Sequence, residues 1–205
     1  MIQTPGAPRP LALEQLFWNT SITQLVRLRR TEVLDAFPEP RALVGRDGTL
    51  LVRGVPLNRP LLVTRFAVVT QFANAIRVAR TPVFDLWRPL GVPRLSLFAG
   101  GRFYDGWLAS SGYVRLWPVA GGPLRGTLRL PLALPRRVKP TQIRFTASGV
   151  NRLVTLRPGH LTTIRFAVSS RRPWTLRFKA LSGGGYLSDG RSVSAQAGEP
   201  VFARR

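Results

Sequence analysis

Four triplets beyond residue 122 each place one arginine between two large apolar residues: Leu128-Arg129-Leu130, Ile143-Arg144-Phe145, Ile164-Arg165-Phe166 and Leu176-Arg177-Phe178. Successive side chains of a β-strand point to opposite faces, so each triplet buries two apolar groups and exposes one guanidinium. Four such strands in series predict a sheet with an apolar inner face and a cationic outer face. The central arginines are therefore candidates for contact with an anionic surface.

The remaining sequence has a similar β-rich pattern. Short alternating segments separated by Gly and Pro turns follow one another after residue 40, and almost none has helical periodicity. We therefore predict an all-β fold, an antiparallel β-sandwich of Greek-key or jelly-roll type, with a less regular N-terminal extension. The expected divisions are a partly flexible extension (1–40), a β-rich first part (41–118) and the Arg-rich strands that complete the sandwich (119–205).

The net charge of +22 over 205 residues, from 31 Lys and Arg against 9 Asp and Glu, favours polyanionic partners. Two interpretations stay open: a solvated cationic face that reflects coding bias, or a surface that contacts a polyanion. The arginines are spread over strands and turns, and the triplet phenylalanines face away from them, which leaves no stacking platform for bases. We expect a glycan or an anionic lipid surface as partner, with a nucleic-acid or ribonucleoprotein role as the alternative.

Residues for catalysis or metal binding are scarce. The chain has no cysteine and one histidine, which excludes disulfides, thiol catalysis and Cys-ligated zinc. That histidine, His160, follows Arg157-Pro158-Gly159 in what we predict to be a tight turn. Asp85 and Asp105 lie among aromatic residues and form the one weak carboxylate pair for a hydrolase. We predict a non-enzymatic protein without catalytic residue, metal or cofactor, and keep that hydrolase as a further hypothesis.

An aromatic loop around residue 105 is the better candidate for ligand binding. Tyr104, Asp105 and Trp107 combine flat apolar rings with a carboxylate, and Arg102 lies beside them in the sequence. Sugar rings stack their C–H faces on aromatic rings, and their hydroxyl groups need charged or polar partners. The alternative is that the tryptophan caps the core while Asp-Gly turns the chain.

Five short motifs follow one another along the chain: FWNTS at 17–21, DG at 47–48, FDLWR at 84–88, GRFYDGW at 101–107 and DGRSV at 189–193. Their order resembles the C-terminal extracytoplasmic domain of actinobacterial-type membrane glycosyltransferases and related envelope proteins. The resemblance implies a β-sandwich accessory domain concerned with sugar or acceptor binding, or with assembly. In that family the polytopic membrane part carries the catalytic residues, so none is transferred to this chain.

The chain has no apolar run of the roughly 20 residues that cross a bilayer, and its first ten residues lack the pattern of a signal peptide. Together with the resemblance, this predicts an accessory binding or assembly module of the cell envelope. We expect it to be extracytoplasmic and associated with the membrane through a partner such as a glycosyltransferase. A cytoplasmic location is the alternative.

Overall fold

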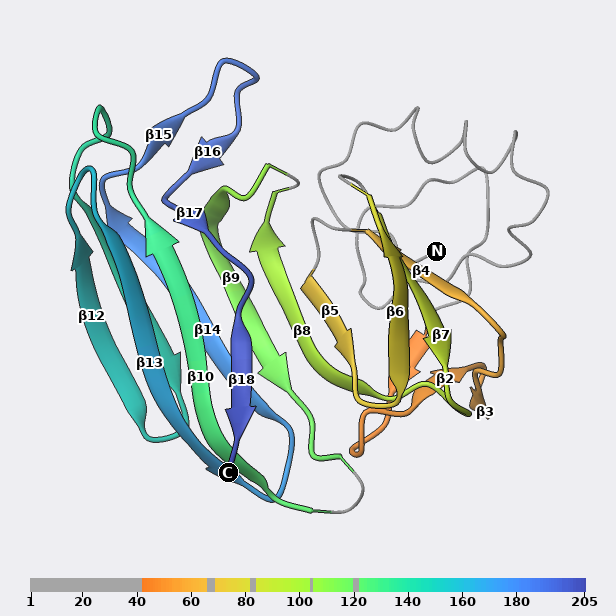
Figure 1. The fold of residues 1–205 in the computed structure, drawn as a ribbon. Helices are drawn as coiled ribbons and strands as arrows, with labels where there is room; N and C mark the ends of the chain where they lie inside the picture. Colours follow the sequence, from red (N-terminus) through yellow and green to blue (C-terminus); the bar gives the residue numbers. More distant parts are fainter. Residues whose placement is uncertain (1–41, 66–68, 82–83, 104, 120–121) are drawn as a thin grey trace.

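The computed structural model describes residues 42–65, 69–81, 84–103, 105–119 and 122–205. Throughout these ranges the regular elements are antiparallel β-strands (Figure 1), which confirms the predicted all-β sandwich. No helix of this part of the chain is long and apolar enough to cross a membrane. The N-terminal extension at 1–40 lies outside the described residues.

The sandwich is formed by two sheets that pack face to face. The larger sheet has the strand order β12-β11-β14-β9-β8-β5, and in the smaller one β10 pairs with β13, β17 and β18. The larger sheet comprises β5 (Val69–Phe72), β8 (Leu95–Arg102), β9 (Leu108–Leu116), β11 (Thr141–Ala147), β12 (Val150–Leu156) and β14 (Trp174–Ser182). The smaller sheet comprises β10 (Leu124–Ala133), β13 (Leu161–Ser170), β17 (Gln196–Ala197) and β18 (Val201–Arg204).

The four Arg-centred strands alternate between these two sheets. Strands β10 and β13 lie in the smaller sheet, whereas β11 and β14 lie in the larger one. The chain therefore crosses the sandwich after β10, β12 and β13, as Figure 1 shows. The prediction of one cationic sheet face was wrong in this respect, because consecutive triplets are exposed on opposite outer faces of the sandwich.

Alternation within each triplet is confirmed. Both apolar residues of all four triplets are buried in one core between the sheets, and each central arginine is exposed. Phe145 lies at the centre of this core. The centroid of its ring is 5.4 Å from that of Phe166 in the opposite sheet and 6.5 Å from that of Phe178 in the neighbouring strand. Burial of each such side chain contributes about 1.5–3 kcal/mol, so these triplets hold the two sheets together.

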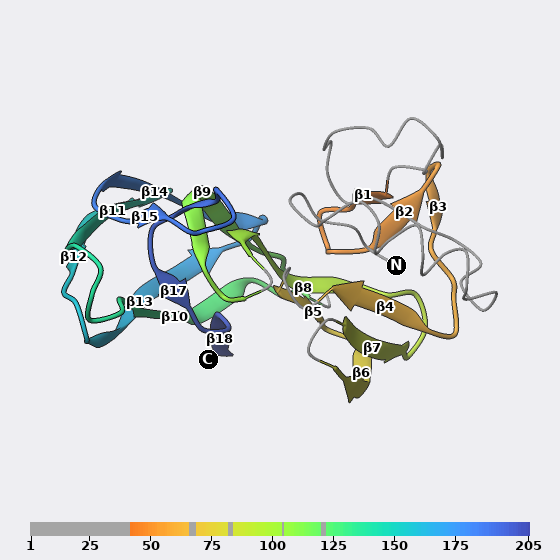
Figure 2. The same ribbon diagram turned by 90° about the horizontal axis from the view of Figure 1, so that it is seen from above.

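The first part of the chain forms smaller sheets beside the sandwich, on the far side of β5 and β8 (Figure 2). One contains β1 (Ala42–Val44), β2 (Leu50–Val52) and β3 (Val55–Pro56), and another β4 (Leu62–Arg65), β7 (Phe84–Pro89) and β6 (Ala75–Arg80). The hairpin β15 (Gly185–Tyr186) and β16 (Ser192–Val193) follows the last long strand. Strands β4 and β5 are close in the sequence but belong to different sheets.

Strand β8 is buried on both of its faces. Leu97 and Ala99 enter the core of the sandwich, whereas Leu95 and Phe98 enter a second core shared with the small sheets and with Trp117. The larger sheet is thus covered on its outer face at the β5–β8 end and exposes charged residues at the β11–β14 end. The boundary between these two regions runs along β9.

Two neighbouring substitutions in β11 should change the stability by very different amounts. Phe145→Ala removes a fully buried ring and should lower the free energy of unfolding by about 3–5 kcal/mol. Arg144→Ala is the matched control, because its exposed side chain should change that free energy by no more than about 0.5 kcal/mol. Urea unfolding followed by tryptophan fluorescence measures both, and equal losses for the two variants would contradict the observed alternation.

Candidate functional site

The loop between β8 and β9 contains the ligand-binding residues that the sequence suggested. Tyr104 lies outside the described residues, whereas Arg102, Asp105 and Trp107 are brought together with the C-terminal segment. Arg102 Nε donates a hydrogen bond to the backbone oxygen of Ala197 at 3.0 Å, and Trp107 forms a β-bridge with Gln196. The loop is therefore fastened to the strand segment that precedes β18.

Arg191 forms the central contact of this loop. Its Nη2 and Nη1 atoms donate to Asp105 Oδ2 and Oδ1 at 2.6 and 3.2 Å, and its Nε donates to Asp189 Oδ2 at 2.6 Å. The guanidinium carbon also lies 4.7 Å from the ring centroid of Phe103. Two motifs far apart in the sequence, GRFYDGW and DGRSV, are joined by this one side chain.

The electrostatics of the loop follow from these contacts. Burial acts to raise the pKa of Asp105, but the hydrogen bonds from Arg191 and from the Trp107 amide outweigh it and hold the pKa below its usual value. The pKa of Arg191 is raised, chiefly by its hydrogen bonds to Asp105. Burial lowers the pKa of Arg102, whereas Glu199 and Asp105 oppose that effect. The charged groups of the loop thus serve contacts within the protein, and sugar binding there stays a prediction.

Asp85 of β7 belongs to a separate charged cluster, where it is directly opposite Arg80 of β6. Its carboxylate is buried and lies 3.1 Å from Arg80 Nε, and Arg80 also binds Glu199 at 2.9 Å. Burial raises the pKa of Asp85, and Arg80 and Arg77 partly offset that rise. Asp85 and Asp105 are therefore neutralised by different arginines. His160 is exposed in the tight turn that the sequence predicted, where its amide donates to the Arg157 carbonyl.

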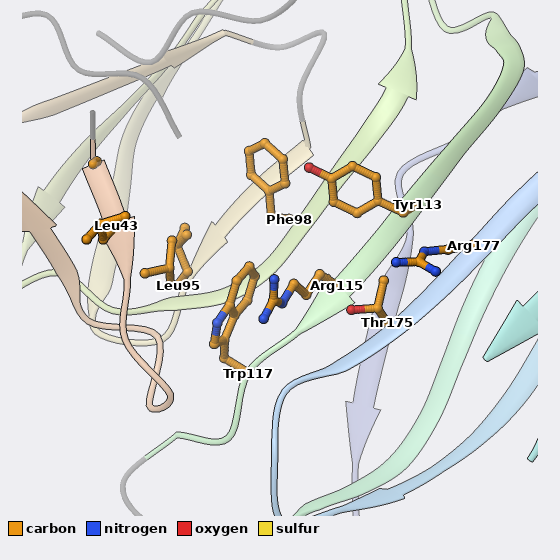
Figure 3. A pocket seen from close by; sticks show the side chains of 10 residues that line it. Leu43, Leu95, Phe98, Tyr113, Arg115, Trp117, Thr175 and Arg177 are labelled. Atoms are coloured by element: carbon orange, nitrogen blue, oxygen red, sulfur yellow. The ribbon is translucent and has the colours of Figure 1, made fainter. Parts of the chain in front are cut away.

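A pocket of about 380 Å³ lies on the outer face of the larger sheet, and its lining residues come from β1, from strands β8, β9 and β14, and from Trp117 directly after β9 (Figure 3). It lies at the boundary between the covered and the exposed part of that face. The lining side chains that can stack on a ligand or hydrogen-bond to it are those of Phe98, Tyr113, Arg115, Trp117, Thr175 and Arg177. The lining from β1 is apolar and comprises Ala42, Leu43 and Val44.

Strand register explains why these side chains meet. Arg115 of β9 is directly opposite Phe98 of β8 on one side and Thr175 of β14 on the other. In the next row, Tyr113 is opposite Arg177. Residues directly opposite on one face have Cβ atoms about 5 Å apart, so the two rows form a continuous lining.

Aromatic rings and guanidinium groups are interleaved in this lining. The Arg115 guanidinium carbon lies 5.2 Å from the centroid of the Trp117 ring, and the Phe98 and Tyr113 rings are 6.0 Å apart (Figure 3). Trp117 is 3% exposed, and its indole nitrogen has no hydrogen-bond partner among the described residues. A buried N–H without a partner costs about 1–3 kcal/mol, so a ligand acceptor that reached it would recover that cost.

Gly100 sets the position of the tyrosine. It lies opposite Tyr113 in the β8–β9 pair, and a Cβ atom added there would come within 2.9 Å of the tyrosine ring. The ring therefore rests on the glycine backbone. Any larger residue at this position would push the ring away from the sheet and into the pocket.

Comparisons with known proteins do not identify a family for this chain. No family model and no curated protein matches the sequence. Among solved structures, a family 35 carbohydrate-binding module from Clostridium thermocellum aligns with 67% of this chain and 89% of its own. Its sequence identity is 13% and its TM-score 0.28, too slight a likeness to support a functional argument. The resemblance to glycosyltransferase domains stays a prediction.

The sequence revealed neither the pocket nor the role of Arg191. Residues 113–117 alternate as a strand, which indicates that Tyr113, Arg115 and Trp117 share a face, but not which face or what lies opposite. Asp189-Gly190-Arg191 was visible as a motif. The sequence offered one clue to the role of Arg191. Because the chain has few carboxylates, Asp105 was one of the few residues that could form an ion pair with it.

Asp105→Asn should destabilise the fold in a pH-dependent way. A pKa held below that of an unfolded aspartate, about 3.9, stabilises the fold fully above pH 5, and this stabilisation is lost as the pH falls through the folded value. We expect the variant to lose about 1–2 kcal/mol in the free energy of unfolding at pH 7. This is at or below the lower end of the range of about 1.5–3 kcal/mol for charged hydrogen bonds, because the pair is partly exposed.

Urea unfolding at pH 7 and at pH 2.5 measures this difference, which should shrink at the lower pH. The double variant with Arg191→Ala should cost less than the sum of the single variants, because both remove one interaction. A deficit that is the same at both pH values would show that the ion pair is not its source.

Proposed function

We propose that this protein is a glycan-binding module whose site is the pocket on the outer face of the larger sheet. The supporting observation is the lining itself, in which three aromatic rings alternate with the hydrogen-bonding groups of Arg115, Thr175 and Arg177. Carbohydrates need both kinds of contact, since their C–H faces pack on rings while their hydroxyl groups require directional donors and acceptors.

The size and rigidity of the pocket fit such a ligand. Its volume of about 380 Å³ is near the lower end of the range of roughly 300–1,000 Å³ for small-ligand sites, which suits one or two sugar rings. Its floor consists of buried Phe98 and Trp117, and the residues at its rim lie on paired strands. A lining held by strand pairing is formed before the ligand arrives, which lowers the entropic cost of binding.

The proposal is of binding without chemistry on the sugar. The pocket lining contains aromatic, aliphatic, hydroxyl and guanidinium groups, and the two carboxylates of the hydrolase hypothesis bind arginines elsewhere. In an accessory role beside a membrane glycosyltransferase, the module would bind the sugar or the acceptor of that enzyme. That role and the envelope location rest on the sequence resemblance, and co-purification with membrane proteins would test them.

Arg115→Ala should weaken glycan binding without unfolding the protein. The side chain is exposed, and a charged hydrogen bond to the ligand is worth about 1.5–3 kcal/mol, which corresponds to a tenfold or greater loss of affinity. The measurement is a screen of immobilised neutral and acidic oligosaccharides, followed by calorimetric titration of the best binder.

Arg125→Ala is the matched control, because Arg125 is an exposed arginine of β10 in the opposite sheet. Its affinity should equal that of the parent protein. Absence of any bound oligosaccharide in the screen, or equal losses for the two variants, would contradict the proposed site.

A further inference from the structure

We infer that the glycan recognised by this pocket is anionic, a sugar chain bearing carboxylate or phosphate groups, and that its charges continue from the pocket along a cationic track across β14 and β11. The track consists of Arg115, Arg177, Lys179 and Arg144. This inference rests on the proposed function and adds to it the chemical class and the direction of the ligand.

Register makes the track continuous. Arg177 is opposite Tyr113, the residue two positions before Arg115, so the two arginines are diagonal neighbours on one face. Such neighbours lie about 7–8 Å apart, and Lys179 lies two residues beyond Arg177 on the same strand, about 7 Å away. Arg144 of β11 is directly opposite Lys179. The four cations thus form a single path that begins inside the pocket.

All four side chains of the track are exposed, and none forms an ion pair with a carboxylate of the described residues. The described acids are engaged elsewhere: Asp47 with Arg94, Asp85 and Glu199 with Arg80, and Asp105 and Asp189 with Arg191. None of these described acids pairs with a cation of the track, so the track has no counter-charge among the described residues.

Crowding of like charges makes this face a place where an anion is stabilising. Like charges directly opposite on a sheet repel each other, and Arg144 and Lys179 have this arrangement. Successive members of the track are closer than the Debye length of about 8 Å at physiological salt, so their fields add. A chain of anionic groups over the track would remove the repulsion and gain attraction.

Donors also predominate inside the pocket. Guanidinium groups and the indole N–H donate hydrogen bonds and accept none. Carboxylate and phosphate groups supply several acceptor atoms in a geometry that matches a guanidinium in bidentate fashion. Neutral sugar hydroxyls can also accept hydrogen bonds from Arg115 and Arg177, but a single hydroxyl oxygen neither matches a guanidinium in bidentate fashion nor neutralises its charge. The lining therefore selects an acceptor-rich, negatively charged sugar.

The test compares tetragalacturonate with its methyl ester, which has the same rings and linkages without the charge, and with a phosphorylated mannan oligosaccharide. Calorimetric titration of the full chain should give at least one anionic ligand tenfold tighter binding than the ester, with affinity that falls as salt rises. Preference for tetragalacturonate assigns carboxylate, and preference for the phosphorylated chain assigns phosphate.

Arg177→Ala and Arg144→Ala should each weaken binding of the anionic ligand by about three- to tenfold, and Arg177→Lys should recover part of the loss. Arg165→Ala removes the same charge from the matching triplet on the opposite face and should change affinity less than twofold. An equal loss for Arg165→Ala would overturn the track, because it would show adsorption by net charge alone.

Two other outcomes would distinguish a failure of the anionic inference from a failure of the proposed glycan site. Equal affinity for the ester and tetragalacturonate, with loss on Arg115→Ala, would overturn the anionic inference and leave the glycan site standing. Failure of all three ligands to bind, together with Arg177-dependent binding of single-stranded DNA, would overturn both and favour a nucleic-acid partner.

Discussion

Burial of apolar side chains at every second position of β10, β11, β13 and β14 is the interaction on which the structure depends. It closes a single core between two sheets, and because the sheet period is two residues, it also decides where every intervening arginine must lie. A shift of one residue in any of these strands would put a guanidinium into the core. The cationic faces are therefore a direct consequence of core formation, whatever their use.

The division of the arginines between two faces gives the molecule its asymmetry. On the smaller sheet, Arg129 and Arg165 are directly opposite each other on the outer face of the sandwich. On the larger sheet, part of the outer face is covered by the first part of the chain, and a pocket forms where that cover ends. Cationic residues beside an aromatic pocket can act together on one ligand, whereas arginines on a plain sheet surface can offer only diffuse attraction. For this reason the proposed binding site is on the larger sheet.

The sequence contains enough information to predict the fold class, the inward and outward residues of the triplets, and the turn at His160. These are local properties, set by alternation and by the turn residues Pro158 and Gly159. The assignment of strands to sheets could not be predicted, because consecutive triplets look alike whether they pair with each other or cross the sandwich. The same limit hid the pocket, since Phe98, Arg115 and Thr175 are neighbours only through cross-strand register. The loop at 102–107 drew attention by its composition, but the partner of Asp105 lies 86 positions away in the sequence.

The indole N–H resonances of the five tryptophans offer the most direct test, because they report separately on the pocket and on the loop between β8 and β9. Proton–nitrogen correlation spectra recorded during titration with tetragalacturonate, with each resonance assigned by substitution to phenylalanine, would show which indole meets the ligand. A saturable shift of the Trp117 indole signal, with Trp107 unaffected, is the predicted result. A shift of Trp107 while Trp117 stays unchanged would place the ligand at the loop and contradict a site on the outer face of the larger sheet.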